Sequence, residues 1–203
     1  MSLSVKCNGM DIQLQADLGR FRPELTCAET GEGGLYEVRL SVVADGPAQV
    51  PTLSLKWKIP SIDIHHKWNP KCSFNRGLDP AVGSANRVES RANNGMPVYS
   101  LYNLDGVNIC TFALSDATHD TRIGGGYGNG KFYSCSAEIY GEKIGIASEY
   151  SVVLRFDFRR VPYYEALRGV SKWWAGMDEY TPCPQSEAAQ MPLLSSWYSY
   201  NLR

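Results

Sequence analysis

Asp116, His119 and Asp120 place two carboxylates and an imidazole within a short stretch of the sequence. Acid/base catalysis or metal binding by this trio would need a further partner, which the spacing alone does not supply. Short polar side chains of this kind also hydrogen-bond readily to nearby backbone groups. We therefore predict a turn that is held by its own side chains.

A second polar cluster, Ile62–Pro70, contains His65, His66 and Trp68. Adjacent residues point to opposite sides of a strand, and no third ligand follows at the spacing that a metal site needs. The segment therefore predicts a solvated loop that carries a histidine pair. We expect neither a metal ion nor a cofactor in this chain.

The glycine-rich segment Gly124–Lys131 has the Gly and Lys spacing of a phosphate-binding Walker loop. Such a loop needs Ser or Thr at the next position, where this chain has Phe132. The residues that follow are typical of a strand, so no helix N-terminus is available to bind phosphate. The pattern predicts a flexible loop between two strands.

The overall charge argues against polyanionic partners. The chain has 203 residues, with 20 basic and 21 acidic side chains and a net charge of −1. This balance gives no field that would attract nucleic acid or an anionic membrane surface. No stretch approaches the roughly 20 apolar residues of a membrane-spanning helix, and no basic-then-apolar leader opens the chain. A cytoplasmic and a periplasmic location both fit.

The six cysteines are scattered and form no Cys-x-x-Cys pair: Cys7, Cys27, Cys72, Cys110, Cys135 and Cys183. Neither a zinc site nor a dense disulfide framework is indicated. Because free cysteine packs as a small hydrophobic residue, we predict buried free thiols.

Apolar residues alternate with polar ones through most of the first 158 positions, as half-buried strands require. The clearest runs are 36–42, 53–59 and 150–158. A β-hairpin is predicted from Val98–Leu104 and Val107–Leu114, joined by Asp105-Gly106 in a type I′ turn. Its register would place Tyr99 opposite Phe112 and Tyr102 opposite Ile109, with apolar groups on both faces, which suits the interior of a sandwich.

After residue 160 the apolar spacing changes to three or four residues, which predicts one amphipathic helix over Val161–Trp174. Pro162 suits its first turn and Gly176 its end. The segment Asp178–Gln190, with two prolines and small polar residues, has the composition of a linker. An apolar, aromatic run, Met191–Asn201, follows and predicts a strand whose partners this chain does not contain.

The pattern Pro-Leu-x-Ser-Ser-Trp-Tyr-Ser-Tyr over residues 192–200 resembles the opening strand of the catalytic barrel in family 36 of the glycoside hydrolases, the α-galactosidase relatives. The order of many strands, one helix, a linker and a strand is similar to that family's layout. The resemblance implies a mostly β fold with a β-supersandwich over 1–160, a connecting helix and linker over 161–190, and the start of a truncated (β/α)8 barrel over 191–203.

In that family two carboxylates on later barrel strands perform a retaining hydrolysis, so the resemblance assigns no catalytic residue to this chain. It implies that Trp197 and Tyr198 bind substrate, because they stand at the end of the strand where such barrels build their sites. Trp68 is the candidate for a tryptophan that the sandwich contributes to the same entrance. The expected ligand is an α-galactoside or another oligosaccharide.

Two other functions stay open. One alternative is a free-standing carbohydrate-binding sandwich. The other is a mutarotase-like enzyme that would use His65, His119 and Glu138, although no matching motif surrounds any of them. An exposed aromatic patch of Trp173, Trp174, Trp197 and Tyr198 is also expected, and it would favour self-association into a homo-oligomer.

Overall fold

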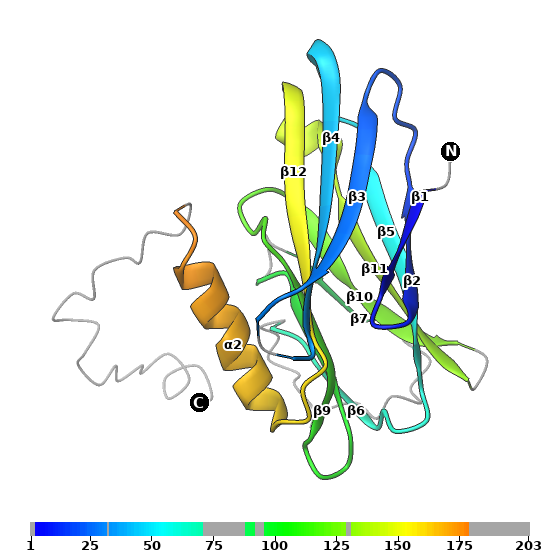
Figure 1. The fold of residues 1–203 in the computed structure, drawn as a ribbon, viewed down its shortest axis with the longest axis vertical. Coiled ribbons are helices and arrows are strands. Elements are labelled where there is room, and N and C mark those ends of the chain that lie inside the picture. The colour runs from blue at the N-terminus through cyan, green and yellow to red at the C-terminus, as the bar shows by residue number, and fades with distance from the viewer. Residues whose placement is uncertain (1–2, 32, 71–87, 92–95, 129–130, 179–203) are drawn as a thin grey trace, which may run out of the picture. The chain divides into compact units, whose positions relative to one another are not determined.

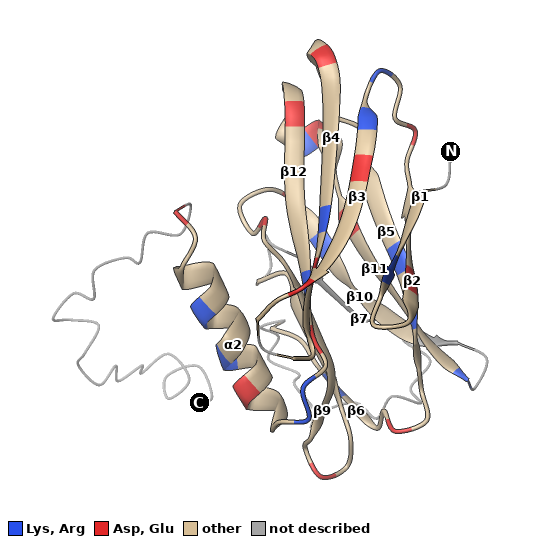
Figure 2. Ribbon diagram, in the orientation of Figure 1, with Lys and Arg blue, Asp and Glu red and all other residues tan. Residues whose placement is uncertain are grey.

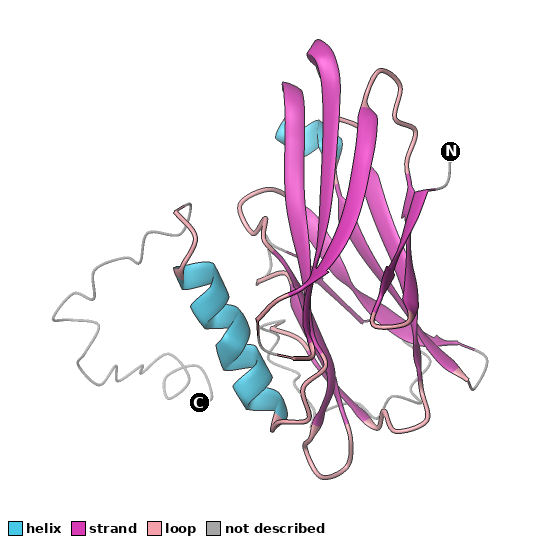
Figure 3. Cartoon of the chain, in the orientation of Figure 1, coloured by secondary structure: helices cyan, strands magenta, loops and turns pink. Residues whose placement is uncertain are grey.

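The computed structural model describes residues 3–31, 33–70, 88–91, 96–128 and 131–178, and this part of the chain is mostly β-strand (Figures 1 and 3). The strands are β1 (Leu3–Cys7), β2 (Met10–Gln15), β3 (Arg22–Glu29), β4 (Leu35–Gln49), β5 (Leu53–Pro60), β6 (His66–Trp68), β7 (Val88–Arg91), β8 (Val98–Tyr102), β9 (Asn108–Leu114), β10 (Thr121–Gly128), β11 (Phe132–Ile139) and β12 (Ile146–Asp157). The helices are α1 (Gly141–Ile144) and α2 (Tyr163–Ala175).

The strands form two antiparallel six-stranded sheets that enclose one apolar core. The first sheet has the order β1-β2-β5-β11-β10-β7, and the second has the order β3-β4-β12-β9-β8-β6. Trp57 of the first sheet packs edge-on against Phe112 and Phe156 of the second, with ring centroids 5.1 and 5.3 Å apart. The expectation of a mostly β, sandwich-like fold is confirmed.

The predicted alternation sets which side of each strand faces the core. In β4, Val38, Leu40 and Val42 are fully buried, whereas Arg39 between them is exposed. β5 and β12 follow the same rule, with inward residues that line the core from Leu53 to Ile59 and from Val152 to Phe156. These strands form because their apolar side chains fall on one face at a period of two.

The predicted hairpin is present and lies inside the second sheet, but its turn differs from the prediction. Tyr99 pairs with Phe112 as expected, whereas a register shift places Tyr102 opposite Asn108 rather than Ile109. Gly106 has a positive φ of 75° and Asp105 does not, so the turn is not type I′. The side chain of Asn103 accepts hydrogen bonds from the backbone N–H groups of Asp105 and Val107, which stabilises a longer loop.

The prediction of a loop is wrong for residues 124–128 of the glycine-rich segment, which belong to β10, a strand that pairs with both β11 and β7. The reason is packing rather than propensity. A Cβ atom at Gly125 would lie 2.6 Å from the Tyr133 ring and 2.7 Å from the Ser134 carbonyl oxygen. Glycine therefore lets β10 pass close to a buried tyrosine, whose hydroxyl donates a hydrogen bond to the Gly125 carbonyl.

The chain divides into two compact units, 1–171 and 172–203, with α2 crossing the boundary. The helix itself matches the prediction. The backbone N–H of Glu165 donates to the Pro162 carbonyl at its start, and that of Gly176 donates to the Lys172 carbonyl at its end. Trp174 is only 7% exposed, so the predicted exposed aromatic patch is wrong for this residue.

The distribution of charge agrees with the balanced composition. Lys and Arg are interspersed with Asp and Glu along the strands, and α2 carries residues of both signs (Figure 2). In the part of the chain that the structure describes, no helix has the length and apolar character needed to cross a bilayer.

Candidate functional site

β6 places Trp68, the only described member of the predicted substrate-binding set, at the edge of the second sheet. The strand pairs with β8, so that His66 lies opposite Tyr102 and Trp68 lies opposite Ser100. The loop before it is held by a 3.1 Å hydrogen bond from the His65 backbone N–H to the Tyr102 carbonyl. The polar cluster thus forms a short edge strand instead of continuing as a loop.

Alternation along β6 separates its side chains into two environments. Lys67 is 1% exposed and lies opposite Leu101, which belongs to the core, and burial lowers the pKa of the Lys67 amine. His66 and Trp68 fall on the other side and are half-buried. Both are therefore on the outer face of the second sheet, which is the side available to a ligand.

The rings of four residues contact one another in series, in the order His66, Tyr102, Tyr163 and Tyr164. We call these four residues, together with Trp68, the aromatic end. His66 and Tyr102 stack with centroids 5.4 Å apart, and Tyr102 stacks on Tyr163 at 4.2 Å with an interplanar angle of 10°. Tyr164 meets Tyr163 edge-on and is 54% exposed. His66 is therefore not the solvated loop histidine that the sequence predicts.

The aromatic end also contains a polar atom that makes no hydrogen bond with the described residues. Nδ1 of His66 is buried and has no hydrogen-bond partner among the described residues. Flat aromatic surfaces beside such polar atoms suit a sugar, whose C–H face packs on a ring while its hydroxyl groups need hydrogen-bond partners. The five side chains offer aromatic ring faces together with phenol hydroxyl, imidazole and indole N–H groups.

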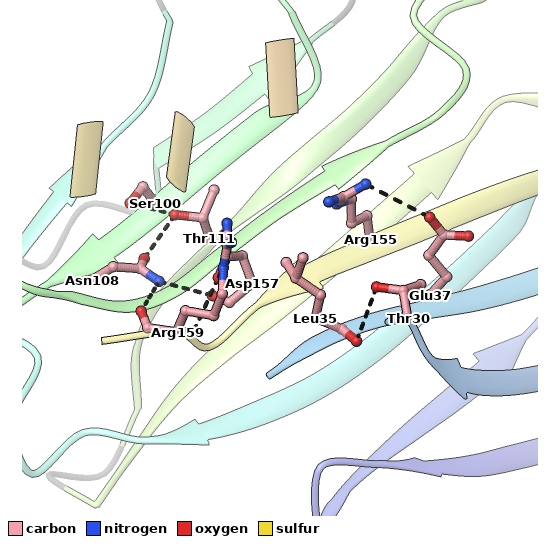
Figure 4. A network of polar contacts seen from close by, with 9 residues as sticks. All are labelled: Thr30, Leu35, Glu37, Ser100, Asn108, Thr111, Arg155, Asp157 and Arg159. Atoms are coloured by element: carbon pink, nitrogen blue, oxygen red, sulfur yellow. Dashed lines mark hydrogen bonds and ion pairs between the residues drawn. The ribbon is translucent and has the colours of Figure 1, made fainter. Parts of the chain in front are cut away.

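A buried polar network around Asn108 joins β9 to the end of β12 and to the segment that follows it (Figure 4). The amide of Asn108 donates to the carbonyls of Asp157 and Arg159 at 2.9 and 3.0 Å, and its oxygen bonds the Thr111 hydroxyl at 2.8 Å. The Tyr163 backbone N–H then donates to the Gly106 carbonyl at 2.9 Å. The first turn of α2 is thereby attached to the tip of the β8–β9 hairpin.

Asp157 and Arg159 complete this network. The guanidinium donates to both carboxylate oxygens of Asp157, at 3.0 and 2.7 Å. A Cβ atom at Gly169 of α2 would lie 3.4 Å from the Arg159 guanidinium, so the helix passes directly over the pair. By the alternation of β12, Asp157 falls on the outer face of the second sheet, yet it is 2% exposed. It is buried because α2 covers this part of the outer face.

At the other end of β9, Asp116 and His119 of the polar trio form a turn as predicted, whereas Oδ1 of Asp120 is buried with no hydrogen-bond partner among the described residues. Oδ1 of Asp116 accepts hydrogen bonds from the backbone N–H groups of Thr118 and His119, at 3.1 and 3.0 Å. Its Oδ2 accepts from His119 Nδ1 at 2.8 Å and from the Tyr150 hydroxyl at 2.6 Å. We call Asp116, Thr118, His119 and Tyr150 the Asp116 cluster.

The carboxyl pKa of Asp116 is lowered although the group is buried. Burial is the largest single influence and raises it, but the hydrogen bonds from Tyr150 and His119 together outweigh burial. The Asp116 side chain is 8% exposed and the His119 side chain 40%. Because the carboxylate oxygens are already occupied by donors, this cluster stabilises a turn rather than binding a ligand, and no group of metal ligands occurs among the described residues.

The other sequence-predicted residues do not join either region. Trp197 and Tyr198 lie outside the described residues. His65 stands beside the aromatic end, His119 belongs to the Asp116 cluster, and Glu138 forms an ion pair with Arg122 at 3.5 Å on the first sheet, so the structure does not assemble a mutarotase-like site.

Sequence reasoning missed Tyr102 and Tyr163 as members of the aromatic end. Tyr102 was predicted only as part of the hairpin and Tyr163 only as part of the helix, and their contact joins segments 61 residues apart (163 − 102). The one local signal was the density of aromatic residues near both. No protein-family model and no curated protein matches this chain.

Proposed function

We propose that this chain is the N-terminal, non-catalytic region of an α-galactosidase-like glycoside hydrolase of the family 36 type, and that its aromatic end forms part of the sugar-binding entrance. In this proposal the described sandwich is the β-supersandwich, α2 is the connecting helix, and residues 191–203 begin the catalytic barrel. The parent enzyme would act on α-galactosides with catalytic carboxylates that lie beyond this chain.

One observation carries the proposal. Trp68, the residue proposed to face the sugar, stands at the same end of the sandwich at which the chain enters α2, because His66 and Tyr163 both stack on Tyr102. The chain therefore leaves the sandwich and enters α2 at the aromatic end. In this proposal Trp68 and Tyr164 of the sandwich are sugar-binding residues, and Trp197 and Tyr198 keep the sugar-binding role that the family resemblance implies.

The coding sequence and the full-length protein test the proposal. We expect the reading frame to continue beyond Arg203 into a barrel that carries two carboxylates, and the full-length enzyme to release nitrophenol from a nitrophenyl α-galactoside while this chain alone does not. In that enzyme Trp68→Ala should lower kcat/KM about tenfold or more through lost stacking. Tyr36→Ala, a half-buried aromatic residue on β4, serves as the control and should leave kcat/KM unchanged. A stop codon directly after Arg203 would contradict the proposal.

A free-standing carbohydrate-binding module is the second candidate, and the 54% exposure of Tyr164 beside a stacked tyrosine favours it. Titration of raffinose or galactomannan against the intrinsic tryptophan fluorescence of this chain separates the two functions. Binding at millimolar or lower concentration, lost in Trp68→Ala, would support the module. A flat titration would support the enzyme fragment.

A further inference from the structure

Two cysteines from different sheets meet where the sandwich has an open side. β1 is the edge strand of the first sheet and β3 is the edge strand of the second, and the two strands pack against each other (Figure 1). Cys7 is the last residue of β1 and lies in the core, 1% exposed. Cys27, within β3, is half-buried and packs against the same core.

The two thiols lie close enough to affect each other's ionisation. Beside burial, which is the largest cause, the neighbouring Cys27 thiol helps to raise the pKa of Cys7, and both side chains pack into the same core. Among the described strands, β1 is laddered to β2 and β3 is laddered to β4, so no backbone hydrogen bonds join β1 to β3. The Cys7–Cys27 pair therefore lies between two edge strands that no backbone hydrogen bond joins.

We propose that Cys7 and Cys27 form a disulfide under oxidising conditions, and that this bond links the two sheets covalently at this edge. We call this disulfide the staple. The oxidant is a small disulfide such as oxidised glutathione. The Cys27 thiolate attacks one glutathione sulfur, so that the Cys27–glutathione bond forms and the bond between the two glutathione sulfurs breaks. The Cys7 thiolate then attacks the Cys27 sulfur and expels the second glutathione. The two protein protons end on the two released glutathione thiols.

The exposure of the two thiols sets the order of these steps. Cys27 is the accessible thiol and reacts first, whereas Cys7 is buried beside it and resolves the mixed disulfide. Burial raises the pKa of both thiols, most strongly that of Cys7, so little thiolate is present at neutral pH. The staple therefore forms slowly, as a structural disulfide does, and does not behave as a rapid peroxide sensor.

The other two described cysteines provide an internal control. Cys110 on β9 and Cys135 on β11 are 0% and 4% exposed and lie in the centre of the core. An oxidant that cannot enter the core leaves both thiols reduced. Oxidation is consequently expected to consume two of these four thiols and no more.

The proposal is tested in a protein that carries Cys72→Ser and Cys183→Ser, which removes the two cysteines outside the described residues. The folded protein is incubated with oxidised glutathione, its remaining thiols are alkylated in denaturant, and it is digested with trypsin without reduction. Cleavage after Lys6, Arg20 and Arg39 places Cys7 in peptide 7–20 and Cys27 in peptide 21–39, because Arg22 precedes a proline and resists cleavage.

The expected product is peptide 7–20 linked to peptide 21–39, with two hydrogen atoms lost and no glutathione retained. Cys27→Ser should leave Cys7 unmodified, whereas Cys7→Ser should trap glutathione on Cys27. The proposal is overturned if the parent protein itself ends with glutathione on Cys27, if all four thiols remain free after prolonged oxidation, or if Cys7 is linked to Cys110 or Cys135.

Stability provides a second readout that does not depend on the peptide map. The staple closes a loop of about 20 residues and should raise Tm by roughly 5 to 10 °C in the oxidised protein relative to the same protein after reduction. Cys27→Ser should show no difference between the two treatments. An oxidised protein whose cross-link is present but whose Tm is unchanged would show that the bond does not staple the sheets.

Discussion

The aromatic end and the Asp116 cluster lie at opposite ends of β9, and they use their polar groups differently. At the Asp116 cluster, the backbone and side chains of Thr118 and His119 and the Tyr150 hydroxyl all donate to one carboxylate. At the aromatic end, Tyr164 is exposed and His66 Nδ1 has no partner among the described residues.

The difference shows that residue type alone does not identify a binding site. From the sequence, two carboxylates beside a histidine are more suggestive of chemistry than a few tyrosines. In the structure the carboxylate of Asp116 has no acceptor capacity left for a ligand, whereas Tyr164 at the aromatic end is exposed. The carboxylate of Asp116 is therefore a poorer candidate for ligand binding than its residue type alone suggests.

The largest expected effect is the loss of the Asp116 carboxylate. Asp116→Ala should reduce the free energy of unfolding by about 3 kcal/mol, because buried donors from the turn and from Tyr150 would lose their acceptor. Urea denaturation measures the change. Asp45→Ala is the matched control, since Asp45 pairs with Arg22 while 88% exposed and should cost at most about 0.5 kcal/mol.

If Asp116→Ala instead leaves stability unchanged and abolishes sugar binding, the assignment of structural and binding roles to the two regions is reversed.

The acid dependence of stability gives a second, smaller effect. The folded-state pKa of Asp116 lies below its ordinary value of 3.8, so its ionisation stabilises the protein above that value and the stabilisation is lost as pH falls through the folded pKa. The difference in unfolding free energy between the wild type and Asp116→Asn should therefore shrink below about pH 4. Denaturation at a series of pH values measures it. A difference that grows in acid would contradict this sign.

The smallest expected effect compares neighbouring tyrosines at the aromatic end. Tyr163→Leu should destabilise the protein by about 1 kcal/mol, because it removes a ring stacked 4.2 Å from Tyr102. Tyr164→Leu should change stability by less than about 0.5 kcal/mol, because Tyr164 is 54% exposed. Thermal unfolding measures both. Equal losses for the two variants would mean that Tyr164 is a packing residue and not part of an open binding surface.

Local patterns explain which features were predictable. The strands around Val38–Val42 and Leu53–Ile59, and the helix that begins at Tyr163, each follow from the spacing of apolar residues within one segment. The type of the hairpin turn was not predictable from Asp105-Gly106, because the Asn103 side chain competes for the backbone N–H groups of the loop. The free thiols of Cys7 and Cys110 follow the predicted burial.

The sequence by itself determined the fold class and the face that each long strand turns to the core, because a period of two is a property of the strand alone. Only the tertiary structure decided that Gly125 belongs to a strand, that Asp157 is buried beneath α2, and that His66, Tyr102 and Tyr163 form one stack. These outcomes depend on contacts between segments far apart in the chain, and no local pattern records which segments will meet.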